Sequence, residues 1–208
     1  MSLESILQKK IQSAMDFIVN AVALSPTERW KLRVTKPQIE YIVDDTLEGH
    51  AQFEVWSNGQ EEKYIFRFRS EAVTDPAAIG EEAGHAVRLI VDDNLRSILL
   101  KTPKESKEYE TLVALEEYAA RYAALAYLNH HKITEYNNLL STIANGKITL
   151  YTTRPSDAMS HFYGYAQAEI DFKRLGVKGL KDVFFTKDMS VLRDAYKLEQ
   201  PQIVNLAA

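Results

Sequence analysis

The sequence predicts an α+β fold: an N-terminal helix, a four-stranded antiparallel meander, long helices, then a C-terminal β-hairpin and an extended tail. Two observations lead to this prediction. Apolar residues recur at the spacing of an amphipathic helix over 2–23, 76–100 and 106–129. Runs in which apolar and polar residues alternate fill 29–69 and return after Gly146, as expected of half-buried strands.

The first third of the chain combines one helix with the predicted meander. The stripe from Ser2 to about Ala23 predicts a helix, which Ser25-Pro26 ends. Alternation around 30–34 and the β-branched and aromatic run 39–43 predict two strands. Two further runs, 52–56 and 63–69, flank an Asn-Gly pair that favours a tight turn, so we expect a hairpin there.

The middle of the chain is predicted to be helical. Asp75-Pro76 supplies a helix start, and one long helix is expected to run from there to about Leu100. The segment 106–129 predicts the next helix, and its many alanines allow a neighbouring helix to approach closely. A short helix over 135–144 is expected to end at Asn145-Gly146.

The last third alternates again with period two. We expect 147–153 and 161–173 to pair as a hairpin, although a helix that begins at Ser156 or Asp157 also fits the second segment. A strand over 183–186, a short helix over 187–196 and an extended tail complete the prediction. We treat 1–208 as a single α+β unit that can be subdivided into 1–101, 102–146 and 147–208.

The amino-acid composition excludes several kinds of functional site. The chain has no cysteine, which excludes disulfides, thiolate zinc sites, iron–sulfur clusters and cysteine nucleophiles. Neither a signal peptide nor the roughly 20 apolar residues of a membrane span is found, so we expect a cytoplasmic or virion protein. The net charge of −4 conceals an acidic segment, 39–82, with eleven acidic and three basic residues, which disfavours a nucleic-acid partner over that surface.

Residues 1–101 contain one set of acidic and basic residues that could form a metal-binding site. The order helix, strands, helix resembles that of restriction-endonuclease-like nucleases, whose sites join an aspartate on one strand to a Glu-x-Lys on the next. The resemblance implies Mg²⁺ held by Asp44 or Asp45 and Glu61, with Lys63 steadying the attacking water. The intervening strand carries tryptophan where the lysine should be, so this metal-dependent nuclease or phosphodiesterase is the alternative function rather than the first choice.

Two other motifs are weaker. Glu82-x-x-His85 has the spacing of a ferritin-like di-iron ligand pair, but no second histidine follows an acidic residue by three positions, so we expect no metal site and no cofactor. Gly176-Val177-Lys178-Gly179 resembles the Gly-x-x-Gly loop of KH domains. A local RNA contact would use the basic residues Lys173, Arg174, Lys178 and Lys181.

The function that the sequence favours is assembly without catalysis. The chain has eleven tyrosines, of which Tyr118 and Tyr122 lie one helical turn apart with Arg121 beside them. Tyrosine and arginine are enriched in protein–protein contacts, although tyrosines at the edge of a core look the same. We expect a homo-oligomer or larger complex, with a bacteriophage neck or tail component as one setting. The expected interface residues are Tyr118, Arg121, Tyr122, Tyr163, Tyr165 and, in the tail, Ile203, Val204 and Leu206.

Overall fold

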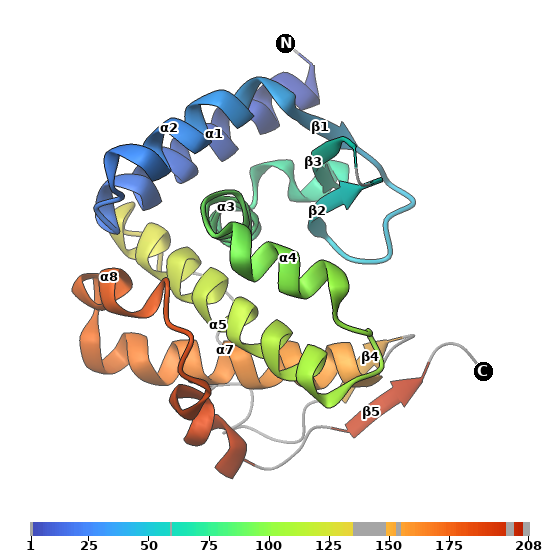
Figure 1. Cartoon of the computed structure of the whole chain (residues 1–208), viewed down its shortest axis with the longest axis vertical. Coiled ribbons are helices and arrows are strands. Elements are labelled where there is room, and N and C mark those ends of the chain that lie inside the picture. The colour runs from blue at the N-terminus through green and yellow to red at the C-terminus, as the bar shows by residue number, and fades with distance from the viewer. Residues whose placement is uncertain (1, 59, 135–148, 153–154, 199–201, 206–208) are drawn as a thin grey trace.

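A computed structural model of the chain describes residues 2–58, 60–134, 149–152, 155–198 and 202–205 (Figure 1). Helices dominate it, and a small sheet lies at one end. The helices are α1 (Leu3–Ala21), α2 (Pro26–Thr35), α3 (Pro76–Val91), α4 (Asp93–Lys101), α5 (Lys107–His130), α7 (Pro155–Leu175) and α8 (Leu180–Val183). The strands are β1 (Ile39–Val43), β2 (Ala51–Ser57), β3 (Glu62–Phe68), β4 (Thr149–Thr152) and β5 (Gln202–Asn205).

The N-terminal helix is confirmed, but the strand expected at 30–34 is wrong, because this segment lies in helix α2. Its start is a capping box: the Ser25 hydroxyl accepts from the Glu28 N–H, and the Glu28 carboxylate accepts from the Ser25 N–H. Pro26 sits in the first turn, where its missing N–H costs nothing. The same Ser-Pro pair that ends α1 therefore starts a second helix, which local alternation concealed.

The sheet is three-stranded and mixed, so the predicted four-stranded antiparallel meander is wrong. The hairpin β2–β3 is confirmed, with Ser57 opposite Glu62 and Ala51 opposite Phe68. Strand β1 pairs parallel with β3 on the other side, which gives the order β1-β3-β2. Strand β2 is therefore an edge strand, and it runs beside α3 (Figure 1).

The predicted helix 76–100 is two helices in the structure. It breaks at Asp92, whose side chain caps α4 by accepting from the Leu95 N–H. The predicted helix 106–129 is confirmed as α5. Close approach to its alanines is also found: a Cβ built on Gly84 of α3 would lie 3.0 Å from the Ala120 Cα. The prediction for 135–144 lies outside the described residues.

The largest error concerns 161–173, which was expected to be a strand and lies in helix α7. The alternation placed polar residues on a solvent face, but three of them are buried and paired. The Gln167 amide donates to Asp171 at 3.0 Å, and the Tyr118 hydroxyl donates to the same carboxylate at 2.8 Å. Gly164, which argued against a helix, lies where α7 crosses α5 and leaves room for the Ala114 carbonyl. Tertiary packing thus outweighs the helix propensity of glycine.

The predicted C-terminal β-hairpin is also wrong, because its second strand, 161–173, lies in helix α7. Strand β4 pairs instead with β5, in parallel, with Leu150 opposite Ile203. The strand expected at 183–186 is replaced by the end of α8 and a turn, and two 3₁₀ turns, Met189–Arg193 and Ala195–Lys197, stand where a short helix was expected. The extended tail is therefore in part a strand that returns to the chain's own β4.

The core lies between the sheet, α1, α3 and α5. Phe66 and Phe68 of β3 are fully buried in it, as are Ile11, Met15 and Ile18 of α1. Among the described residues, none of the helices is long and apolar enough to cross a membrane. Helix α5 packs against both α3 and α7, so polar groups on these three helices can meet.

Candidate metal centre

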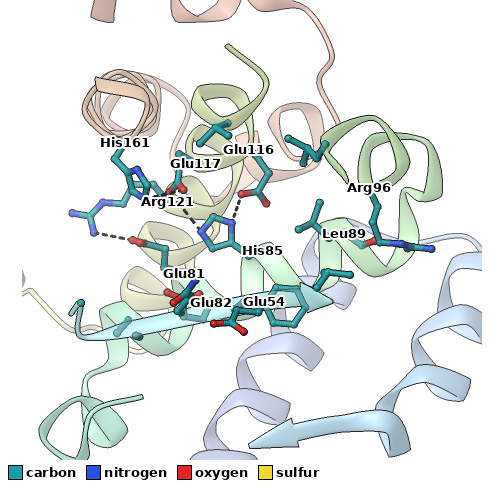
Figure 2. Close-up of a pocket in the computed structure, with 18 of the residues that line it drawn as sticks. Glu54, Glu81, Glu82, His85, Leu89, Arg96, Glu116, Glu117, Arg121 and His161 are labelled. Atoms are coloured by element: carbon teal, nitrogen blue, oxygen red, sulfur yellow. Dashed lines mark hydrogen bonds and ion pairs between the residues drawn. The ribbon is translucent and has the colours of Figure 1, made fainter. Parts of the chain in front are cut away.

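Acidic and histidine side chains gather where α3, α5 and α7 meet (Figure 2). Glu81 and His85 lie one turn apart on α3, Glu117 comes from α5, and their ligand atoms all lie within 4.8 Å of one another. Glu81, His85 and Glu117 are thus a candidate metal-binding group in the described part of the chain. Glycines and alanines between α3 and α5 bring the helices close enough for this meeting.

The imidazole of His85 is oriented by two carboxylates. Its Nδ1 forms an ion pair with Glu116, and its Nε2 faces Glu117 Oε2 at 3.5 Å. Metal-ligating histidines commonly donate one ring N–H to a carboxylate, which fixes the tautomer and leaves the other nitrogen for the metal. Glu116 can fill this supporting role while Nε2 of His85 points into the cluster.

Glu117 offers an oxygen that the protein leaves without a hydrogen bond. Its Oε1 lies 3.0 Å from His161 Nε2 of α7, but Oε2 is buried and has no hydrogen-bond partner among the described residues. This oxygen instead faces His85 Nε2 in an ion pair at 3.5 Å, and the raised pKa of His85 keeps that ring positively charged, which offsets the cost of burying the carboxylate. A metal ion held by both groups would replace the proton on His85.

Burial and neighbouring charges shift the pKa values of the groups in the cluster. Burial alone would lower the pKa of His85, but Glu116 and Glu117 outweigh it and hold that pKa well above its ordinary value. Burial raises the pKa of Glu81. Burial would also raise the pKa of Glu117, but His161 and His85 outweigh burial and lower it. A divalent cation supplies the same compensation as a protonated imidazole, and ligation releases the proton.

Glu82 stands apart from the group that faces the metal position. Only 7% of the residue is exposed, and its carboxylate accepts a hydrogen bond from the Phe53 backbone of β2. Burial raises the pKa of Glu82 to about 8. A carboxyl with a pKa near neutrality can both take up and release a proton, which general acid–base chemistry requires.

The cluster opens into a cleft of about 1270 Å³. Its walls include most of β2, the facing side of α3, helix α4, the N-terminal part of α5 and, from α7, His161 and Tyr165. The cleft is larger than most small-molecule sites, which run to roughly 1,000 Å³. It is therefore large enough for a ligand bigger than a typical small molecule.

The structure does not bring the nuclease residues together. Strands β1 and β3 run parallel, so Asp44 lies beside Phe68 whereas Lys63 lies at the other end of β3, about 17 Å away at the usual rise of a strand. Asp44 accepts hydrogen bonds from Thr46, and Asp45 accepts one from Ser70. Glu61 is exposed in the turn.

The expected interface residues lie mostly inside the chain. Tyr118, Arg121 and Tyr122 on α5 are buried, and Tyr163 on α7 packs against Tyr196. Tyr165 donates a hydrogen bond to Glu81, beside the candidate metal ligands. Ile203 and Val204 belong to strand β5, and Leu206 lies outside the described residues.

The four basic residues of the RNA hypothesis are exposed around the C-terminal end of α7, and Arg174 pairs with Asp171. Gly176 has φ +60° and ends α7, so the Gly-x-x-Gly segment forms a turn.

The spacing that the sequence analysis singles out is not the spacing of the candidate metal ligands. Glu82 and His85 are three apart, but the pair that converges is Glu81 and His85, four apart. The third ligand carries no local signature, because Glu117 comes from another helix. A usable signal was a Glu-Glu-x-x-His run on one predicted helix followed by Glu-Glu on the next.

Comparison with known proteins gives no relative to this chain: no family model, curated protein or solved structure matches it.

Proposed function

We propose that this chain is a metal-dependent hydrolase that cleaves amide bonds in extended peptide segments. The observation that carries the proposal is the convergence of Glu81, His85 and Glu117 with Glu82 beside them. In zinc peptidases, a His-Glu-x-x-His helix binds the metal through its two histidines and uses the intervening glutamate as a general base. The run Glu81-Glu82-Ala83-Gly84-His85 has that spacing, with a carboxylate in place of the first imidazole.

The donor set narrows the choice of metal. Two carboxylates and one imidazole resemble the two-histidine, one-glutamate sites of catalytic zinc, in which a fourth position stays open for water or substrate. This group has one more carboxylate and one fewer imidazole than those zinc sites, and carboxylate oxygens also suit Mn²⁺ and Fe²⁺. We therefore name Zn²⁺, Mn²⁺ and Fe²⁺ as the candidate metals.

The positions of the three candidate ligands and of Glu82 indicate what each would do in the reaction. Glu81, His85 and Glu117 would hold the metal, and the chemistry it would supply when bound is polarisation of the substrate carbonyl and a more acidic water. The Glu82 carboxylate would accept a proton from the attacking water, whose oxygen would form the new bond to the carbonyl carbon. Glu82 would then give that proton to the leaving nitrogen, so that the C–N bond would break to give a carboxylic acid and an amine.

A peptide substrate is favoured by strand β2. This strand forms the edge of the sheet, and residues 49–56 line the cleft. The outward-facing backbone groups of an edge strand can bind an extended peptide as an added strand, and on β2 one such group, at Phe53, is bonded to Glu82. Because the Phe53 backbone donates to Glu82, a peptide along this edge would pass the proposed base.

The test is cleavage of a pool of unstructured peptides, with products identified by mass spectrometry. We expect cleavage by the metal-loaded chain, loss of cleavage after chelation and recovery when metal is returned. Glu82→Gln should retain metal but lose roughly 100-fold or more in rate, the usual contribution of a general base. An intact pool, or equal cleavage by the Glu82→Gln variant, would contradict the proposal.

The assembly role expected from the sequence stays a prediction that the particle mass in solution tests. Three of the residues expected at the interface, Tyr118, Arg121 and Tyr122 of α5, are buried inside the chain. We therefore put the hydrolase forward as the first proposal.

A further inference from the structure

A row of side chains on α7 reaches the metal cluster from the side opposite β2. His161, Tyr165 and Glu169 are spaced four residues apart and therefore share one face of the helix. Each contacts a different member of the cluster or its surroundings: His161 meets Glu117, Tyr165 meets Glu81 and Glu169 meets Arg121. The α7 face therefore holds groups from both of the other helices.

Tyr165 is placed to fix the direction of the Glu81 carboxylate. Its hydroxyl donates to Oε1 of Glu81, while Arg121 Nη1 lies 3.5 Å from Oε2 of the same group. A carboxylate on a flexible side chain can rotate, and these two contacts fix both of its oxygens. The orientation of a ligand is commonly set by such outer contacts, whose removal costs roughly 10–100-fold in metal affinity.

Arg121 in turn holds the Tyr165 ring. The Arg121 guanidinium lies 5.0 Å from the centre of that ring, which is cation–π distance. Its Nη2 donates to Glu169 at 3.0 Å, and both partners of this pair are buried. A buried ion pair of this kind is weak evidence for stability, since desolvation offsets the attraction. Fixing the geometry of a neighbouring site explains the pair better.

We propose that Tyr165 is a positioning residue of the metal site, which orients Glu81 for ligation and is itself held by the Arg121–Glu169 pair. This inference rests on the proposed function, because it assumes that Glu81 is a ligand. It assigns α7 a role in controlling how tightly the metal binds and with what geometry. Tyr165 donates through its hydroxyl, so removing that single atom is the direct perturbation.

The experiment compares Tyr165→Phe with Tyr163→Phe in the full chain after metal is stripped. Tyr163 lies two residues away on α7 and packs against Tyr196, which makes it a matched control outside the site. Affinity for Zn²⁺ is measured by competition with a chromophoric chelator, and the visible absorption of bound Co²⁺ reports ligand geometry. We expect about 10–100-fold weaker Zn²⁺ binding and an altered Co²⁺ spectrum for Tyr165→Phe only.

The outcomes separate the two proposals. If the wild-type chain binds no metal, the proposed function fails and this inference fails with it. If the wild type binds and Tyr165→Phe matches it within twofold with an unchanged Co²⁺ spectrum, the positioning role is wrong while the proposed function stands. If Tyr165→Phe loses its helical circular dichroism, Glu169→Gln is used in its place. Weaker Zn²⁺ binding and a changed Co²⁺ spectrum in Glu169→Gln would support the inference. An unchanged Zn²⁺ affinity and Co²⁺ spectrum would overturn it.

Discussion

Replacing Gly164 by alanine should separate α5 from α7 at the place where they support the candidate metal centre. A Cβ at this position would lie 2.6 Å from the Ala114 carbonyl oxygen and 2.8 Å from the Tyr118 nitrogen. Both are backbone atoms of α5, which cannot move aside as the end of a flexible side chain can. Overpacking of this kind costs about 1–3 kcal/mol, and we take the upper end because the contacts are with backbone.

The helix propensity of alanine opposes this cost by about 1 kcal/mol. The net expectation for Gly164→Ala is a loss of about 2 kcal/mol in the free energy of unfolding, which for a chain of this size lowers Tm by roughly 4–8 °C. Urea denaturation of the metal-free protein measures the loss. Gly49→Ala is the control, because its Cβ would meet the Ala51 carbonyl at an ordinary 3.8 Å, and it should change stability by less than about 0.5 kcal/mol. A Gly164→Ala variant as stable as the wild type, or more so, would refute the close crossing of α5 and α7.

Three further predictions address the revised elements and the earlier hypotheses. Ser25→Ala removes the α2 cap and should cost about 1 kcal/mol in urea denaturation, whereas exposed Thr27→Ala should be neutral or slightly stabilising; the reverse order would indicate a strand. Asp44→Asn should leave affinity for divalent metals unchanged in a titration, and a clear loss would restore the nuclease hypothesis. Tyr118→Phe leaves Asp171 without one buried donor and should cost about 1–3 kcal/mol with no change in particle mass; a shift in mass without loss of stability would place Tyr118 at an interface.

The elements that could be predicted from sequence are those whose signals are local. The stripes of α1 and α5 and the Asn-Gly hairpin follow from neighbouring residues, and all three are confirmed. Helix α7 could not be found this way, because Gly164 is explained by a carbonyl of α5 and its polar positions are explained by partners far along the chain, such as Tyr118. The parallel pairing of β1 with β3 is likewise a long-range choice.

The candidate metal centre likewise combines residues with a local sequence signal and residues that only long-range packing brings together. Glu81, Glu82 and His85 lie within five residues, so half of the site was visible in the sequence. The other half depends on the meeting of three helices, and a strand over 161–173, which the sequence predicts, does not bring His161 against Glu117 of α5 as helix α7 does. Buried acidic residues also oppose the stability of a core, and such conflicts between local rules and structure are expected at functional sites.

The candidate metal centre is tested most directly by the binding of Zn²⁺ to the wild-type chain and to His85→Ala, measured by calorimetry together with elemental analysis. We expect one metal ion per wild-type chain and a loss of about 100-fold or more in affinity for the variant, because imidazole supplies the single nitrogen ligand of the group. Absence of bound metal in the wild type, or equal affinity in the variant, would contradict the central claim that Glu81, His85 and Glu117 form a metal centre.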